Sequence, residues 1–539
     1  MEANNANKTA IPDLSQKGTS KKVVISVMGL AIMNVTTIVS LRGLPSQAEY
    51  GLSSIFYYSL AALLMLIPVS LVCAELASTF PKKGGLFRWV SEGLGVRWGF
   101  VAMYMEWLAI VMWFPTVLIF AGVAIAYICW PESFDDTLAS NKTYTIITLL
   151  AVYWLATLNT FRGLKASAKL STYGGLFGTI IPAAILVILA AIYLIMGQPV
   201  HLPLDQPFFP DFSKLNTLVL AASIFLFYAG MEMQAVHVEH LKNPKKNYPI
   251  AVFIATLITI CIFILCTLSV GVVIPEKEIN LVQTLLIAYE KLWSNIGLPW
   301  MGHVMAFMCA FGVLGQSSVM IGGTTTGMLM TGRAGYLPKP LQRTNKNGMQ
   351  VPILLIQGVI ISCIVFVLIL LPSVQSGYQV FSQMATIIFL IMYVIIYIAA
   401  IRLRYTQPNK KRAFLIPGGK FGIWFVGLLG LFGAISGIVL SFIPPSQINI
   451  GSPAVYVSIL IVGVLFFSII PFVIYALRKP NWFDTNSQFE PFDFELEGRK
   501  ASEKSKWPAD FEPTPQQIEE FKQKRNNLIL EWENTHKKK

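Results

Sequence analysis

Long apolar segments recur along the whole chain and alternate with short polar stretches. Most have roughly 20 residues, the length that an α-helix needs to cross the hydrocarbon core of a bilayer. Several carry almost no charge, such as residues 173–196 and 250–274. The pattern predicts an all-α integral membrane protein with about twelve transmembrane helices. The predicted spans are residues 23–45, 52–77, 99–129, 143–159, 168–196, 215–238, 249–274, 298–330, 352–372, 379–401, 420–443 and 453–477.

The composition agrees with a chain embedded in a membrane. Of the 539 residues, 55% are hydrophobic and 13% are charged, whereas a soluble domain carries about 25% charged residues. These values exclude an ordinary soluble protein, a disordered chain and a disulfide scaffold. The six cysteines lie in apolar stretches without metal-ligand spacing, so we interpret them as small core residues. The net charge of +13 comes largely from loops between apolar segments, which favours a membrane protein over a nucleic-acid partner.

Basic residues are concentrated in every second loop. Residues 82–97, 162–169, 242–246, 333–346 and 402–412 carry lysines and arginines, whereas the intervening loops carry mainly acids. The positive-inside rule therefore places the basic loops and both termini in the cytoplasm. The predicted organisation is a cytoplasmic N-terminal tail at 1–22, a transmembrane domain at 23–478 and a cytoplasmic C-terminal tail at 479–539.

The C-terminal tail differs in composition from the rest of the chain. It is charged and contains prolines, and one amphipathic helix is predicted near residues 515–534. The tail fits either a flexible end or a regulatory segment. Both alternatives stay open at this point.

Two of the predicted spans contain helix-breaking and polar residues. In the first span, polar residues together with Gly43 and Pro45 interrupt the apolar run, and in the sixth span Gly230 and Glu232 do so. A membrane helix is broken only where protein or a water-filled cavity satisfies the freed backbone groups. Interrupted first and sixth spans have the spacing of a five-plus-five inverted repeat, in which broken helices meet at the bilayer midplane.

Broken helices favour a particular kind of ligand. They expose N–H groups at one end and C=O groups at the other, and these suit the carboxylate and the ammonium of an amino acid. Glu232 is interpreted as a gating or proton-linked carboxylate, or as a structural hydrogen-bond hub. Arg42 fits three roles: meeting an acidic substrate side chain, pairing with a buried carboxylate such as Glu106, or extending to the outer surface. Glu75 is expected to anchor a loop.

Other chemistry finds little support in the sequence. No nucleophile elbow or nucleotide-binding loop is present, so the chain is not expected to be an enzyme or to need a cofactor. His237, Glu239 and His240 match no strong zinc signature, and no metal is expected. The aromatic residues fit core packing better than a gate; these are Trp113, Phe114, Phe389 and Tyr393. A channel or sensor that binds an amino acid without turnover remains an alternative.

Ordered motifs resemble those of a known superfamily. Residues 74–90, 228–232, 243–249 and 332–352 resemble motifs of the amino acid–polyamine–organocation (APC) superfamily. Four further segments resemble its bacterial glutamate/GABA antiporter branch; they are residues 97–100, 209–214, 274–281 and 416–420. The resemblance covers residues 23–478. The chain departs from the pattern at Gln316, where an acid is usual, at Met320, where an aromatic gate is usual, and at Arg42.

The resemblance implies a fold, a function and a site. The fold is a five-plus-five inverted repeat (LeuT-like) with two additional C-terminal helices, in the bacterial inner membrane. The function is secondary active amino acid transport by alternating access, as glutamate/GABA-like exchange or as proton-coupled symport of another specificity. The partners are amino acids and the bilayer, with protons as a further candidate. The implied substrate residues are Thr37, Ile38, Val39, Ser40, Leu41, Ala229, Gly230 and Glu232, and the candidates for gating or selectivity are Arg42, Tyr228, Gln316 and Met320.

Overall fold

The structure is a computed structural model, and the parts of the chain that it describes are helical. It describes residues 26–81, 84–129, 132–202, 208–209, 218–230, 232, 241–446, 448–484, 489–508 and 513–536. The longer helices are α1 (Val27–Ile38), α3 (Ser53–Ala61), α4 (Ile67–Thr79), α5 (Gly85–Leu94), α6 (Val96–Cys129), α7 (Glu132–Ala139), α8 (Lys142–Thr160), α9 (Leu164–Gly175), α10 (Ile181–Ile195), α11 (Val219–Phe227), α13 (Pro244–Val273), α14 (Thr284–Asn295), α15 (Met301–Thr331), α16 (Val351–Val365), α17 (Val374–Thr406), α18 (Gly419–Ser441), α19 (Pro453–Ala476) and α21 (Pro515–His536), with the short α2 (Leu44–Ala48) and α20 (Asp493–Leu496).

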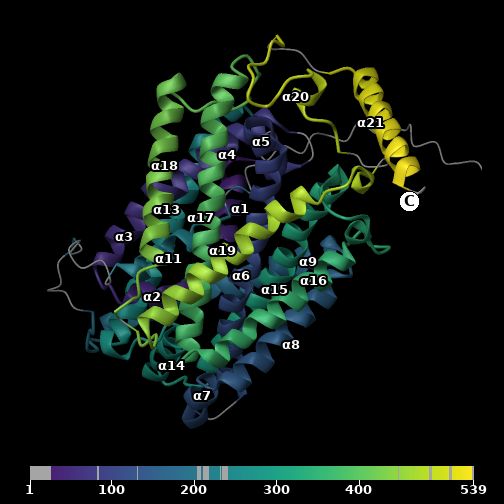
Figure 1. Ribbon diagram of the computed structural model, residues 1–539. Helices are drawn as coiled ribbons and strands as arrows, with labels where there is room; N and C mark the ends of the chain where they lie inside the picture. Colours follow the sequence, from purple (N-terminus) through teal and green to yellow (C-terminus); the bar gives the residue numbers. More distant parts are fainter. Residues whose placement is uncertain are drawn as a thin grey trace, which may run out of the picture.

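The helices form one bundle around α6. This helix packs against α5, α8, α15 and α17, and nearly all of its residues are buried. Figure 1 shows α5, α20 and α21 at one end of the bundle and α7 and α14 at the opposite end. The core of the molecule is therefore the contact region of α6, α15 and α17.

Nine helical segments of the described residues are long and apolar enough to cross a membrane. The remaining predicted spans correspond to α1, α8 and α11, which are shorter or interrupted helices. The prediction of an all-helical membrane protein is confirmed at this level, whereas the count of twelve and the inverted repeat stay predictions. Phe421 and Phe432 of α18 and Phe466 of α19 are exposed on the outside of the bundle, where lipid would cover them.

Glu75 fastens a loop to the end of α4, as the sequence predicts. Its buried carboxylate forms ion pairs with Arg404 at 2.5 Å and with Arg412 at 3.4 Å. The carboxylate also accepts a hydrogen bond from the backbone N–H of Ile416 at 2.9 Å. Three partners on one carboxylate hold the segment after α17 against the bundle.

The first described segment of the C-terminal tail after residue 484, beginning at Phe489, is packed against α5. Phe489 and Phe492 are buried, and their rings contact Phe87 of α5. The buried Arg88 guanidinium donates hydrogen bonds to the carbonyl groups of residues 490 and 491. Residues 489–494 are therefore not a purely flexible end, because they are held by these contacts.

Candidate functional site

The helix of the first predicted span is interrupted at Val39 and Ser40. Helix α1 ends at Ile38, and the next two residues are extended, with ψ of 122° at Val39 and 127° at Ser40. The chain then forms one helical turn, η1 (Leu41–Gly43), before α2 begins. A break of this kind exposes backbone groups that a continuous helix would pair. The interruption predicted from the sequence is present.

The sixth predicted span is interrupted as well. Helix α11 ends at Phe227, and residues 228–230 form a turn in which Gly230 has a φ of +112°. Glycine adopts this conformation readily because it has no Cβ. The backbone is helical again at Glu232, while residues 231 and 233–240, with His237, Glu239 and His240, lie outside the described residues.

The two interrupted spans are in direct contact. A Cβ on Gly43 would lie 2.3 Å from Cζ of Phe227, so any side chain at this crossing would displace the Phe227 ring. One turn later, the Gln47 amide donates hydrogen bonds to the carbonyl of Leu220 at 2.9 Å and to the hydroxyl of Ser223 at 3.2 Å. These contacts hold the first span beside α11.

Both interruptions line one buried cavity, called the central cavity here. Its volume is about 30 Å³, and a water molecule needs roughly 10–15 Å³ of such space. In this state the cavity is too small for an amino acid, so a substrate enters only if the lining side chains move. The lining residues are Ile38, Ser40, Arg42, Ile110, Trp113, Leu226, Phe227, Ala229, Gly230, Gln316, Met320 and Phe389.

Arg42 is buried against the central cavity. Its Nη1 donates a hydrogen bond to Oγ of Ser40 at 2.8 Å, and its guanidinium carbon lies 5.0 Å from the ring centroid of Trp113. Only 4% of its surface is exposed. Among the described residues, no carboxylate forms an ion pair with it. Pairing with Glu106 and extension to the outer surface, two roles left open by the sequence, are therefore wrong.

A second cavity contains two carboxyl groups and is called the carboxylate cavity. It has a volume of about 350 Å³, and Glu106 and Glu232 both line it. Oε2 of Glu232 accepts a hydrogen bond from the Tyr393 hydroxyl at 2.7 Å, whereas Oε1 is buried without a hydrogen-bond partner among the described residues. Met320 lines both cavities and stands between them.

The predicted site residues divide into four groups. Those at the central cavity are Ile38, Ser40, Arg42, Ala229, Gly230, Gln316 and Met320, and Glu232 lies at the carboxylate cavity. Val39, Leu41 and Tyr228 line neither cavity. Val39 packs in a small apolar cluster with Val35 and Ala255, and Leu41 belongs to the main core. The Tyr228 hydroxyl donates to the carbonyl of Tyr58 at 3.1 Å. The Thr37 side chain lies outside the described part.

Three of the four aromatic residues predicted to pack in the core belong to the site instead. Trp113 and Phe389, expected in the core, line the central cavity, and Tyr393 bonds to Glu232. Phe114 packs in the core as expected. Nothing in the pattern separates these aromatic side chains, because all lie on long apolar helices.

A separate group of candidate metal ligands lies at the end of the bundle that contains α7 and α14. Donor atoms of Asp135, Glu290 and His303 all lie within 4.8 Å of one another. Nδ1 of His303 lies 2.7 Å from the carbonyl oxygen of Tyr127, which orients the ring. Glu290 and His303 lie on the consecutive helices α14 and α15, but Asp135 lies on the distant α7, so sequence spacing does not reveal the group.

Comparison with known proteins identifies the family. Residues 25–466 match the model of the amino acid permease family. The chain belongs to this family. It is therefore a multi-pass membrane protein of a transporter family, not of an enzyme family, and its family transports amino acids.

Two relatives cover nearly the same length. An uncharacterized transporter of Legionella pneumophila is 37% identical over 452 residues, which are 84% of this chain and 96% of the relative. A glutamate/gamma-aminobutyrate antiporter of Lactococcus lactis is 33% identical over 466 residues, or 86% of this chain and 92% of the relative. A probable agmatine/putrescine antiporter of Lactococcus lactis is 22% identical over 398 residues.

Proposed function

We propose that this amino acid permease is an antiporter that exchanges amino acids across the bacterial inner membrane by alternating access. The observation that carries the proposal is that the breaks at Ser40 and Gly230 line the same buried cavity. Such breaks offer peptide N–H and C=O groups to a zwitterion. The relative named as a glutamate/gamma-aminobutyrate antiporter supports exchange as the mode of transport.

The backbone of the substrate would lie between the two breaks. The carbonyl groups at the ends of α1 and α11 favour the ammonium group, and the N–H groups after each break favour the carboxylate. This arrangement gives roles to Ile38, Ser40, Ala229 and Gly230, which line the cavity at the two breaks. Thr37 stays among the proposed substrate residues, whereas the side chains of Val39 and Leu41 pack in apolar clusters, so these two would act through their backbone groups alone.

Arg42 favours a substrate with a negatively charged side chain. A buried guanidinium with no carboxylate partner among the described residues is costly, and an acidic substrate would supply that partner. Glutamate is therefore the first candidate. Gln316 and Met320 would contact the substrate side chain and adjust selectivity, and Met320 would move when the path between the two cavities opens.

The carboxylate cavity supports a role for protons. Glu106 and Glu232 face one space, and carboxyl groups at membrane depth commonly mark ion or proton pathways. We propose that Glu232 couples occupancy of the central cavity to gate closure through its bond to Tyr393. Proton-coupled symport is the second candidate, favoured by this pair of carboxyl groups.

The orientation follows from charge. The basic loops 333–346 and 402–412 contact the C-terminal tail, as the ion pair of Arg333 with Asp484 at 3.7 Å illustrates. We propose that this end of the bundle, with both termini, faces the cytoplasm.

Counterflow in proteoliposomes tests the function. Vesicles that contain the purified protein are loaded with one unlabelled amino acid, and uptake of a labelled one is followed at two pH values with glutamate, GABA, glutamine and arginine. Antiport predicts that loaded vesicles take up label much faster than empty vesicles. Equal uptake by loaded and empty vesicles that depends on a pH gradient would establish symport instead. A protein that binds glutamate but moves none would be a sensor.

A further inference from the structure

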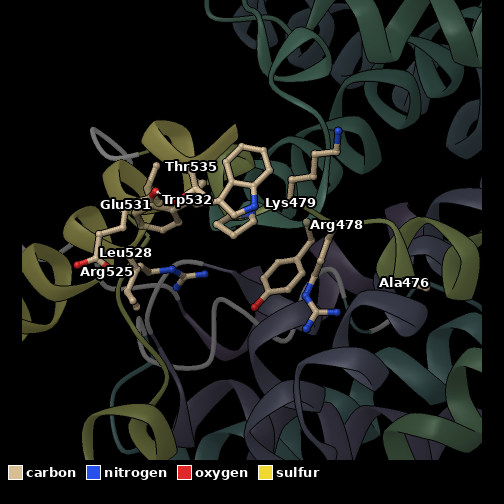
Figure 2. Close-up of a pocket in the computed structure, with 13 residues that line it drawn as sticks. Ala476, Arg478, Lys479, Arg525, Leu528, Glu531, Trp532 and Thr535 are labelled. Carbon is tan, nitrogen blue, oxygen red and sulfur yellow. Dashed lines mark hydrogen bonds between the residues drawn. The ribbon is translucent and has the colours of Figure 1, made fainter. Parts of the chain in front are cut away.

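A cavity of about 730 Å³ lies between the C-terminal tail and the membrane domain, away from the two cavities described above. We call it the tail cavity (Figure 2). One wall comes from α21 and the other from the end of α19 and the short turn η10 (Pro480–Trp482). Since α19 is a candidate membrane span that ends at Ala476, the cavity lies where this helix leaves the apolar layer.

Three basic side chains surround the tail cavity. Arg478 and Lys479 come from the segment after α19, and Arg525 comes from α21. Figure 2 shows the first two on one side of the cavity and Arg525 on the other. Glu531, the single acid among the described lining residues, extends away from Arg478 and Lys479. Lys479 forms no ion pair or hydrogen bond through its side chain with the described residues. The cavity therefore presents an excess of positive charge.

The arginines are held in place while part of each guanidinium remains available. Nη1 of Arg478 donates to the carbonyl of Tyr475 at 2.9 Å, and the guanidinium lies 3.9 Å from the Tyr475 ring centroid. Nη2 of Arg525 donates to the carbonyl of Ala334 at 3.3 Å, beside the Phe483 ring. Each guanidinium has five N–H donors, so other donors remain for an anion.

Exposed apolar surface adjoins these charges. Leu528 lines the tail cavity and keeps 57% of its surface exposed, and Leu477, next to Arg478, keeps 65% exposed. Trp532 also lines the cavity, and its ring is turned toward Lys479 in Figure 2. Tryptophan beside basic residues at the end of a membrane helix is typical of the interface between lipid and water. The surface combines an anion site with a site for hydrocarbon.

We propose that the tail cavity binds the phosphate headgroup of an anionic phospholipid, from the leaflet that α19 reaches at Ala476. The phosphate oxygens accept hydrogen bonds from Arg478, Lys479 and Arg525. The acyl chains stay in the bilayer beside Leu477 and Leu528. A free phosphate ion would leave this apolar surface uncovered, which is why the lipid is the better fit. The bound lipid links α19 to α21 and so stabilises the docked tail.

Native mass spectrometry of the purified full-length protein tests the proposal. Phosphatidylglycerol, phosphatidylethanolamine or inorganic phosphate is added, and lipid retention is measured for the wild type and for the double variant Arg478→Gln/Lys479→Gln. The wild type should retain phosphatidylglycerol in preference to phosphatidylethanolamine, and the double variant should bind it about tenfold more weakly. The matched control Lys339→Gln/Arg343→Gln removes two exposed charges from the loop between α15 and α16 and should bind like the wild type.

Three results would overturn the lipid site. They are equal retention of phosphatidylglycerol by both double variants, equal retention of the two lipids by the wild type, and displacement of phosphatidylglycerol by inorganic phosphate, which would indicate a free-anion site. If the double variant does not fold, the single variant Lys479→Gln takes its place, because its side chain has no described partner whose loss would disturb the fold.

Discussion

The hydroxyl of Tyr393 donates a hydrogen bond to Oε2 of Glu232 at 2.7 Å. The hydroxyl oxygen of Tyr393 in turn accepts a hydrogen bond from the backbone N–H of Gly230 at 3.2 Å. One side chain of α17 therefore contacts both the carboxylate and the break in the sixth span. A change in the charge of Glu232 would therefore alter the hydrogen bonds of Tyr393, including its bond to Gly230 at the proposed substrate site.

Glu232→Gln is expected to abolish exchange while the protein stays folded. Glutamine keeps the size of the side chain and an acceptor for Tyr393, but it cannot carry the charge or release a proton. Counterflow and the thermal unfolding temperature are measured together. Tyr393→Phe, which keeps the carboxylate and removes one hydrogen bond to it, should lower exchange by about tenfold. Normal exchange by well-folded Glu232→Gln would refute the role of this carboxylate.

Arg42→Ala should selectively weaken the binding of acidic substrates. The loss of a buried charge partner is expected to reduce the affinity for glutamate by about 10- to 100-fold, with little change for neutral amino acids. Competition against labelled substrate measures both. An equal loss of affinity for neutral and acidic substrates would show that Arg42 supports the structure of the site and does not recognise the acidic side chain.

Gly323→Leu should block the path through the carboxylate cavity. A Cβ on Gly323 would have no atom within 4 Å, and Gly323 lines the cavity, so a larger side chain here is expected to occupy its space. Transport should fall strongly while the unfolding temperature stays within a few degrees. Gly175→Leu is the matched control, because this helical glycine also has open space around its Cβ but lies away from both cavities. Equal transport by the two variants would place the path elsewhere.

Glu75→Ala should destabilise the fold. Its removal leaves Arg404 and Arg412 buried without their carboxylate, at a cost of roughly 3–5 kcal/mol. Thermal unfolding of the purified protein measures the effect. Glu278→Ala is the control, since its ion pair with Lys291 at 3.4 Å is exposed and should contribute less than about 1 kcal/mol. Similar effects of both substitutions would contradict the role given to Glu75.

Docking of the tail on α5 should weaken as the pH rises. Burial, together with the Asp493 carboxylate, raises the pKa of Glu92 from 4.5 to about 7, although Arg88 and Lys410 act in the opposite direction. The docked state therefore binds more protons than the undocked state between these two values, and its stability decreases as the pH increases through this window.

Hydrogen exchange of residues 489–501, corrected for the intrinsic pH dependence, measures this effect. Protection in the wild type should be higher at pH values near 5 than above 7. Glu92→Gln stays neutral at every pH, so its protection should be nearly independent of pH. A wild-type protein with the same protection across the range would contradict the assignment to Glu92.

The sequence was sufficient for the parts of the fold that depend on local chemistry. Membrane segments require long apolar runs, and breaks require residues such as Gly230 that tolerate unusual backbone angles, so both could be recognised without coordinates. The loop-anchoring role of Glu75 followed from a charge near the end of an apolar helix.

Contacts between distant segments could not be predicted in this way. Arg88 bonds to the carbonyl of Pro491, about four hundred residues away in the chain, and no local pattern records such a contact. Trp113 and Phe389 line the central cavity because of how α6 and α17 pack, although their surroundings in sequence resemble those of any core aromatic residue. The contacts of Arg42 with Ser40 and Trp113 likewise depend on how the helices pack.

Protection of a cysteine at position 40 by substrate tests the central claim most directly. Ser40→Cys is introduced into a transport-active background without the native cysteines, and alkylation by a small thiol reagent is timed with and without the amino acid that gives the strongest counterflow. Binding between Ser40 and Gly230 predicts that this amino acid slows alkylation, whereas a non-transported amino acid does not, and that a cysteine at position 175 reacts at one rate throughout. An alkylation rate at position 40 that saturating substrate leaves unchanged, in a protein that still transports it, would contradict the site.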